Sequence, residues 1–258
     1  MQLYHNPMSS CSQKVRLVLA EKRLPYESTV LDLQRGDQFQ PEYVALNPQA
    51  VVPTLIDAGQ SIIESTLINE YLEEHYTAIK LMPVQASARH QVRLITKLFD
   101  ETLHPACGII TYAIGIRPNL LRLSQADINA LLDGIPDSTR RLNREQVIRH
   151  GIKAKNFADA LNSYLAVLDQ VEDRLTTQHY LVGNDISLAD FALLPYVIRL
   201  DHLAFNDAIA SRPFVSAWYQ RLQQRPSFKT AVVDWLSESA VNAFRAAGKK
   251  IKNEVSLH

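Results

Sequence analysis

Hydrophobic residues follow two different periodicities on either side of residue 80, and this change limits what the chain can fold into. Residues 2–76 alternate between strand-like and helix-like segments, in the order strand, helix, strand, short helix, two strands and helix. Residues after 84 contain no convincing strand and carry long amphipathic patterns instead. The sequence therefore predicts a small α/β domain, residues 1–80, followed by an all-helical domain, residues 86–258.

Apolar spacing and turn residues also predict where the elements lie. In the first part, strands are predicted over 2–5, 28–33, 53–56 and 61–63, and helices over 14–24 and 65–75. In the second part, helices are predicted over 90–112, 125–132, 157–175, 215–224 and 228–247. Ser187 and Asp190 have the spacing of a capping box, so a further helix is expected to begin there.

Glycine is scarce in this chain, and the few glycines are widely spaced. There are eight in 258 residues, and no two lie closer than seven positions. This spacing excludes the dinucleotide fingerprint GxGxxG and the P-loop, because both need glycines closer together. A negatively charged small molecule would have to bind in another way.

Charge and composition exclude several other classes of function. The 27 basic residues balance 27 acidic ones, so the basic face typical of nucleic-acid binding is not expected. No apolar run approaches the roughly 18 residues of a membrane span, and the N-terminus does not resemble a signal peptide. We therefore expect a cytoplasmic protein with neither nucleic acid nor membrane as a partner.

The cysteines and histidines indicate free thiols and no metal. Cys11 and Cys107 are too few and too far apart in sequence for a disulfide framework. The eight histidines include no pair at i, i+4, so a helix-borne zinc site is not expected.

A turn rich in hydroxyls precedes the first predicted helix. Ser9, Ser10 and Cys11 lie where backbone N–H groups and the helix dipole favour a negative charge, and their side chains add donors. This arrangement suits one thiolate. The simpler interpretation is that these residues only cap the helix.

Two further segments favour a ligand-binding interpretation. Val52-Pro53 begins a strand, where a cis bond would leave the backbone of Val52 free to pair with an extended peptide. Glu64 and Ser65 open the last helix of the unit, where Ser65 can receive a carboxylate and Glu64 an amine. A thiolate donor, a peptide-pairing edge and an amino-acid clamp together point to glutathione.

These motifs resemble those of soluble glutathione transferases, from about residue 2 to residue 238. SSCSQKVRL resembles the zeta-class signature, and DQFQPEYVALNPQAVVPTL and ESTLINEYLEE follow the same class, that of the maleylacetoacetate isomerases. The resemblance implies the glutathione transferase fold, an α/β thioredoxin-like N-terminal domain plus an all-α C-terminal domain. It also implies a homodimer and glutathione as cosubstrate.

The resemblance further implies a role for each motif residue. The catalytic group is expected at the helix N-terminus: Ser9, which assists the thiol, with Ser10 and Cys11 beside it. The glutathione contacts are expected from both domains: Gln38 at the glycine end, Val52 and Pro53 at the cysteine backbone, Glu64 and Ser65 at the γ-glutamyl group, and His104. Tyr112 and Arg117 are expected to line the pocket of a hydrophobic electrophile. Cys107 is expected to pack in the core for a different reason, because it lies on a largely apolar predicted helix.

The chain departs from the family pattern at two places. Ala50 replaces the glycine of the NPxGxVP motif, and no lysine follows, which leaves Gln38 or Arg16 for the glycine carboxylate. Residues 113–155 are longer than usual. With the Ser9-x-Cys11 pair, this length resembles the bacterial tetrachlorohydroquinone reductive dehalogenases, in which a Cys at the position of Cys11 attacks the glutathionyl intermediate.

The sequence thus predicts a glutathione S-transferase that activates the glutathione thiol for attack on an electrophile, typical of detoxification. Conjugation, isomerisation and reductive dehalogenation are the outcomes that the resemblance implies. Two alternatives stay open: a Cys11-dependent glutathione thiol-disulfide oxidoreductase, and a non-catalytic binding protein on the same fold. Cys11 itself is either a small packing residue or a nucleophile of lowered pKa.

Overall fold

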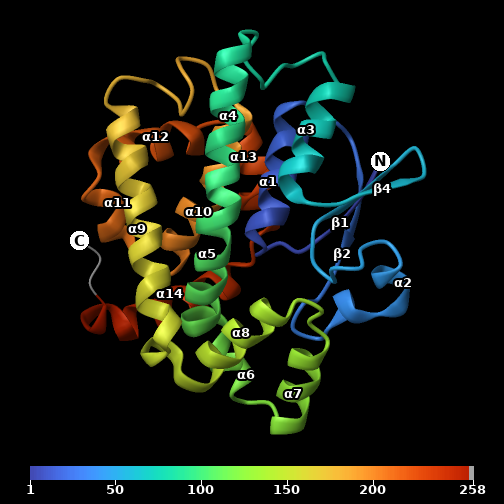
Figure 1. Ribbon diagram of the computed structural model, residues 1–258, viewed down its shortest axis with the longest axis vertical. Coiled ribbons are helices and arrows are strands. Elements are labelled where there is room, and N and C mark those ends of the chain that lie inside the picture. The colour runs from blue at the N-terminus through green and yellow to red at the C-terminus, as the bar shows by residue number, and fades with distance from the viewer. Residues whose placement is uncertain (256–258) are drawn as a thin grey trace.

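A four-stranded mixed sheet forms the centre of the N-terminal part in the computed structural model, which describes residues 1–255 (Figure 1). The strands are β1 (Gln2–His5), β2 (Glu27–Val30), β3 (Thr54–Asp57) and β4 (Gln60–Ile62), in the spatial order β2-β1-β3-β4. β1 and β2 are parallel, whereas β3 is antiparallel to both of its neighbours, β1 and β4. The helices of this part are α1 (Ser10–Glu21), α2 (Pro41–Val44) and α3 (Ser65–His75).

The two faces of the sheet pack against different helices. Leu3 of β1 lies in the main core with Leu17 of α1 and Ile68 of α3, all fully buried. The next residue, Tyr4, points to the opposite face and contacts Tyr43 of α2, with ring centroids 5.7 Å apart. This alternation follows from the two-residue period of a strand, and it keeps α1 and α3 on the face that meets the second domain.

All regular structure from residue 86 to residue 255 is helical (Figure 1). The α-helices are α4 (Ala86–Leu98), α5 (His104–Thr111), α6 (Arg117–Leu120), α7 (Gln125–Asp133), α8 (Ser138–His150), α9 (Lys155–Leu175), α10 (Leu188–His202), α11 (Asn206–Ala210), α12 (Pro213–Gln223), α13 (Pro226–Ala231) and α14 (Glu238–Ile251). Within residues 1–255, no helix has the length and apolar character needed to cross a membrane. The last three residues of the predicted second domain, 256–258, lie outside the described part of the chain.

The predicted helix over 90–112 is part of a longer helical run that contains two π-helical segments. Phe99–Leu103 joins α4 to α5, and Tyr112–Ile116 joins α5 to α6. The N–H of His104 donates to the carbonyl of Phe99, five residues earlier. A π-segment inserts an extra residue and so changes the direction of the side chains that follow it, and such segments are frequent at functional sites.

One prediction about the second half was wrong, and one helix was not foreseen. The single helix over 228–247 is instead α13, a 3-10 turn and α14, because Ser237 caps α14 by accepting from the N–H of Ala240. The polar region after residue 113 was expected to hold at least one short helix around 125–132, which is confirmed as α7, and it also forms the 13-residue α8. Since α8 buries only Val147 and Ile148, it lacks the apolar stripe by which a surface helix is identified.

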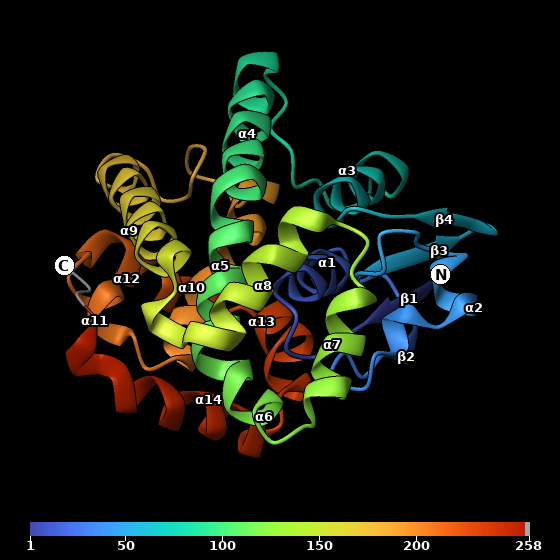
Figure 2. The ribbon, with the colours of Figure 1, turned by 60° about the horizontal axis from the view of Figure 1, so that its bottom comes forward.

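The long segment 113–155 folds back onto the N-terminal domain. Figure 2 shows α7 beside the sheet, near α2 and β2, and α8 farther from the sheet, next to α5. The contact is apolar, since Phe39 packs against a small cluster formed by the segment itself: Leu120, Ile128, Leu132, Ile135 and Ile148. At Gly134 a Cβ would lie 2.9 Å from the Phe39 ring, so glycine permits this close approach. The extra length therefore ties the two domains together.

The start of α10 is closed by a buried capping box, as predicted from Ser187 and Asp190. Asp190 is fully buried, and its carboxylate accepts from the N–H of Ser187 at 2.9 Å and the N–H of Leu181 at 3.0 Å. The indole N–H of Trp218 donates to the same carboxylate at 2.9 Å. These donors compensate the cost of burying the charge, so the residue acts in the fold.

Candidate active site

The loop before α1 is held by two buried arginines. Arg16, on α1 itself, donates to the carbonyls of Asn6 at 3.1 Å and Pro7 at 3.0 Å, and Arg199 of α10 donates to that of Met8. Arg16 is fully buried. The hypothesis that Arg16 replaces the missing lysine at the glycine carboxylate is therefore wrong, since its guanidinium is committed to the protein backbone.

The three residues of the hydroxyl-rich turn face different surroundings. Ser9 is the N-cap of α1, and its Oγ accepts from the N–H of Ser12 at 3.2 Å. Its own O–H proton is not used by this bond, so the hydroxyl can still donate to a ligand. Ser10 is buried, and its Oγ lies 3.7 Å from the Sγ of Cys107 in the domain interface. This contact directs Ser10 away from a ligand at the helix end and gives Cys107 the buried position expected of it.

Cys11 lies against a histidine from the helical domain. The Sγ of Cys11 and the Nδ1 of His104 are 3.4 Å apart, although the two residues are 93 positions apart in sequence. Cys11 is half-buried and His104 is exposed. The π-segment before α5 sets the direction of His104, and the cap of α1 sets that of Cys11. The structure therefore brings two of the predicted site residues together as a thiol–imidazole pair.

This pair shifts the pKa values of both groups toward an ionised state. Burial raises the pKa of the Cys11 thiol, but the charge and hydrogen bond of His104 outweigh it. With smaller contributions from Lys14 and Ser65, the pKa of Cys11 falls to about 7. In turn, the Cys11 thiolate raises the pKa of His104. Near neutral pH the pair is suited to a thiolate beside an imidazolium, the form in which cysteine is a nucleophile.

The sequence interpretation missed Lys14, a buried cation that acts on this pair. Its Nζ lies 2.7 Å from the carboxylate of Asp100 and 5.1 Å from the ring centre of Tyr196, and its side chain is fully buried. The spacing offers a signal, because Lys14 follows Cys11 by three positions and so lies on the same side of α1. Lys14 adds positive potential around the Cys11 sulfur.

The loop before β3 leaves one peptide unit free. The Val52–Pro53 bond is cis, as predicted. The carbonyl of Val51 accepts from Tyr43 at 2.5 Å and from Asn47 at 2.9 Å. By contrast, the N–H and carbonyl of Val52 have no hydrogen-bond partner within residues 1–255. A buried residue with a free backbone edge is consistent with the predicted pairing to an extended peptide.

The other predicted glutathione contacts lie around the start of α3 and in the turn Asp37–Phe39. Glu64 precedes α3 with a φ of +67°, a value unusual for a residue other than glycine, and its side chain is exposed. Ser65 is buried at the start of α3 and helps to lower the pKa of Cys11. Gln38 is buried as well, and its Oε1 has no partner in the described part of the chain. Their roles toward glutathione stay predictions.

The side chains of the two residues expected in the electrophile pocket differ in how far other protein groups already engage them. Arg117 donates to the carbonyls of Ile148 at 2.8 Å and Arg149 at 3.3 Å, so it holds the C-terminal end of α8. Tyr112 is half-buried, and the guanidinium of Arg144 lies 4.0 Å from the centre of its ring. Tyr112 therefore remains a candidate for the pocket, whereas the guanidinium of Arg117 is engaged elsewhere.

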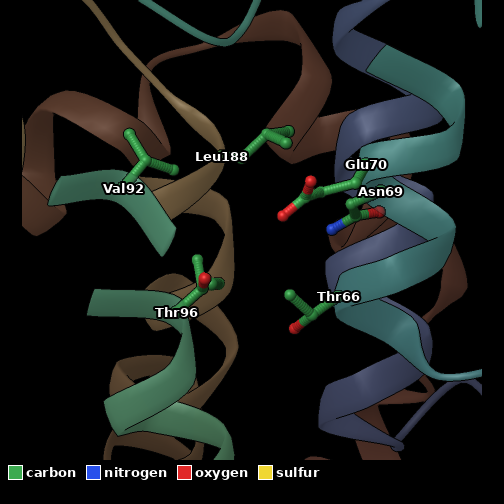
Figure 3. Close-up of a pocket in the computed structure, with 7 residues that line it drawn as sticks. Thr66, Asn69, Glu70, Val92, Thr96 and Leu188 are labelled. Atoms are coloured by element: carbon green, nitrogen blue, oxygen red, sulfur yellow. The ribbon is translucent and has the colours of Figure 1, made fainter. Parts of the chain in front are cut away.

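A small cavity between α3, α4 and α10 is too small for a substrate. It measures about 10 Å³ and is lined by Thr66, Asn69, Glu70, Val92, Thr96, Leu188 and Ala192 (Figure 3). Within residues 1–255, the Oγ1 of Thr66 and the Oδ1 of Asn69 lack hydrogen-bond partners. In the same described range, no group of three or more His, Cys, Asp or Glu side chains is arranged to hold a metal ion.

Two family models match the parts of the chain that carry this geometry. Residues 8–75 match the model described as Glutathione S-transferase, N-terminal domain. Residues 146–221 match the model described as Glutathione S-transferase, C-terminal domain. The chain belongs to the glutathione S-transferase family. Most of the segment 113–155 lies outside both matches.

Individual relatives agree with this assignment over nearly the whole length. A probable maleylacetoacetate isomerase from Vibrio cholerae is 31% identical over 233 residues, which cover 89% of this chain and 94% of that protein. The tetrachloro-p-hydroquinone reductive dehalogenase of Sphingobium chlorophenolicum is 27% identical, with 90% and 96% covered. The crystal structure of the β-etherase LigF from Sphingobium sp. strain SYK-6 superposes with a TM-score of 0.83 at 26% identity, covering 90% of this chain and 98% of that one.

The predicted family resemblance, fold class and reaction class are therefore confirmed. This glutathione S-transferase is a glutathione-dependent enzyme with isomerase and reductive dehalogenase relatives. Its fold combines a thioredoxin-like domain with a helical one.

Proposed function

We propose that this transferase uses two thiols at the N-terminus of α1: the thiol of bound glutathione and that of Cys11. The observation that carries the proposal is the 3.4 Å contact between Cys11 and His104, together with the pKa of about 7 that it gives the cysteine. A thiol placed so is reactive at neutral pH, next to the site where the family binds glutathione.

In the first step, Ser9 activates glutathione. The Ser9 hydroxyl donates a hydrogen bond to the glutathione sulfur, while its Oγ keeps the bond from the N–H of Ser12. Together with the dipole of α1, this bond favours the thiolate. The thiolate attacks an electrophilic carbon, a C–S bond forms, and the leaving group departs with its electron pair. The product is a glutathione thioether.

The pair of Cys11 and His104 supports a second, reductive step. When the thioether lies next to an electron-withdrawing carbonyl, the Cys11 thiolate can attack the glutathione sulfur. An S–S bond forms, the C–S bond breaks, and the carbon takes the electron pair and a proton from the His104 imidazolium. A second glutathione then reduces the mixed disulfide, which restores the Cys11 thiol and releases glutathione disulfide.

The names of two similar proteins indicate which leaving groups to test. One removes chlorine from a hydroquinone and the other is named for cleaving ethers, so halide and aryloxide are the natural choices. Both leave from carbon as anions after attack by a thiolate, and both therefore fit the same first step.

The proposal includes four further features. Residues 1–80 would hold glutathione and residues 86–258 the hydrophobic electrophile. A homodimer, a cytoplasmic location and a role in detoxification belong to it as well, on the strength of the family resemblance.

Two substrates test the roles of the glutathione thiol and the Cys11 thiol separately. 1-Chloro-2,4-dinitrobenzene reports conjugation, and S-phenacylglutathione, which releases acetophenone, reports the reductive step. We expect Ser9→Ala to lower conjugation at least tenfold, and Cys11→Ser to lower acetophenone release at least 100-fold. Cys107→Ser is the matched control for the loss of a thiol.

The outcomes also separate the alternatives. Full acetophenone release by Cys11→Ser would remove Cys11 from the chemistry. A chain that reduces a glutathione mixed disulfide through Cys11 but conjugates nothing would be an oxidoreductase. Glutathione binding measured by calorimetry without turnover of either substrate would indicate a non-catalytic binding protein.

A further inference from the structure

Two arginines of α8 lie close together without a carboxylate partner. Arg140 and Arg144 are one helical turn apart, and both are half-buried. Within residues 1–255 neither forms an ion pair, whereas Arg149 on the same helix pairs with Glu145 at 2.5 Å. Like charges at this spacing repel each other. An unpaired, half-buried arginine pair is therefore the arrangement expected where an anion binds.

The pair faces the part of the molecule where the glutathione site is proposed. Arg140 donates from Nη2 to the carbonyl of Gln49 at 3.0 Å, in the loop that leads to the cis Pro53. Arg144 lies over the ring of Tyr112, 4.0 Å from its centre. The arginines thus lie between the loop 47–53 of the N-terminal domain and Tyr112 of the helical domain.

The hydrogen-bonding capacity of Arg140 is only partly used. Its Nε is buried and has no partner within the described residues. Burial first, and then the charge of Arg144, lower the pKa of Arg140, while Asp137, Tyr112 and Glu64 act in the opposite direction. Neither Asp137 nor Glu64 lies within ion-pair distance of it. A ligand that brought its own negative charge would satisfy the guanidinium and relieve the repulsion.

The segment that carries the pair is held in place by packing. α7 and α8 share the apolar cluster that contains Phe39 of the N-terminal domain, and Arg117 holds the carbonyls at the end of α8. The arginines therefore project from a helix that is already fixed. This favours binding because little conformational entropy is lost when a ligand orders their side chains.

We propose that Arg140 and Arg144 bind a carboxylate at the mouth of the glutathione site, so that one reactant is recognised as an anion by the segment 113–155. The proposal rests on the proposed function, because it takes the cleft beside Cys11 as the reaction site. The planar guanidinium fork suits a carboxylate, which accepts two parallel hydrogen bonds. The carboxylate comes either from the glycine end of glutathione or from the electrophile.

The experiment compares carboxylates with neutral analogues in three variants. Arg140→Gln and Arg144→Gln are assayed beside Arg141→Gln, a control on the same helix whose side chain has no hydrogen bond or ion pair within residues 1–255. One arm compares glutathione with its glycine ethyl ester. The other arm compares 4-chloro-3-nitrobenzoate with 4-chloro-3-nitrobenzamide. The quantities measured are kcat/KM in each arm and the melting temperature of each variant.

We expect at least a tenfold loss of kcat/KM for the carboxylate member of one arm, and less than a twofold loss for its neutral analogue, as for a lost charged hydrogen bond. A loss in the first arm assigns the site to glutathione, and a loss in the second assigns it to the electrophile. Equal losses for charged and neutral members, or losses matched by Arg141→Gln, would overturn the proposal.

Two controls keep this result separate from other failures. If Arg140→Gln does not fold, Arg144→Gln carries the test, since its side chain makes no hydrogen bond within the described residues. If the wild-type chain turns over no electrophile, the proposed function fails. Calorimetry of glutathione and of 4-chloro-3-nitrobenzoate, each beside its neutral analogue, on the wild-type chain and Arg140→Gln then still tests the carboxylate site: a tenfold selective weakening for either carboxylate supports it, and unchanged affinities for both overturn it.

Discussion

The first turns of α1 and α10 both follow a serine N-cap, yet they serve different ends. At α10, the carboxylate of Asp190 is fully buried and accepts from four donors around it. At α1, Ser9 alone caps the helix, and the first turn contains no acidic residue. The helix end at α10 is closed by the protein, whereas our proposal assigns the one at α1 to a ligand.

The charges around the two helix ends explain this difference. An acidic side chain in the first turn satisfies the free N–H groups and the positive end of the dipole from within the chain. In α1 the corresponding third position is Ser12, which brings no charge; the thiol of Cys11 lies one residue earlier, and the nearby charged groups are His104 and Lys14. A serine-capped helix start thus stabilises the fold at α10, where the anion is the buried Asp190 carboxylate. At α1, where the anion is the Cys11 thiolate, our proposal makes it reactive.

The largest effect is expected from removing the buried carboxylate at the start of α10. Asp190→Ala leaves the N–H groups of Leu181, Ser187 and Trp218 buried without a partner, which costs about 3–5 kcal/mol of unfolding free energy. Ser9→Ala, the matched change at α1, costs about 1 kcal/mol because it removes a single cap bond. Urea unfolding followed by tryptophan fluorescence measures both. Equal losses would show that the two helix ends do not differ in this way.

The next effect concerns the charge at the open end. In the native chain the Cys11 thiolate forms as the pH rises through about 7, and below that pH the thiol is protonated and unreactive. His104→Asn removes the cation that lowers this pKa, so the rise moves toward the ordinary thiol value near 9. At pH 7 we expect alkylation by iodoacetamide to slow about five- to fifty-fold. The profile is measured by intact mass in a Cys107→Ser background, and an unshifted profile would contradict the ion pair.

A smaller change in the same direction is expected from Lys14→Met. Lys14 lowers the pKa of Cys11 less than His104 does, so its loss should slow alkylation at pH 7 only about two- to fivefold. Asp100 stays partly exposed and tolerates the loss of its partner. An effect larger than that of His104→Asn would mean that Lys14, not His104, controls the thiol.

The smallest effect tests the loop beside the open end. Ala50 is buried with a φ of +50°, in the left-handed region where the family motif has glycine. Glycine removes the steric cost of that conformation but adds freedom to the unfolded chain. Ala50→Gly should therefore raise the unfolding free energy by about 0.5–1 kcal/mol and leave Cys11 alkylation unchanged. A lowered stability would show that the loop is not strained at this residue.

Local elements were predicted well where the apolar period was strong. The helix expected over 65–75 coincides with α3, and the strand expected over 2–5 coincides with β1. The prediction failed where tertiary packing, and not an apolar periodicity in the sequence, determines the secondary structure. α8 carries almost no apolar stripe. The region around Trp235 forms a separate turn, and the ring centroid of Trp235 lies 4.6 Å from that of His5 in β1.

By itself, the sequence determined the two-part architecture, a serine cap at the start of α1, the capping box at Ser187 and the family, because these follow from local spacing and motifs. Only the tertiary structure decided that Arg16 is an internal anchor, that Cys11 faces His104, and that Arg140 reaches the loop at Gln49. Each of these contacts depends on the direction of a side chain after two elements have packed. Local spacing predicts on which face of a helix or strand a residue lies. It does not predict which side chains of another element that residue will contact.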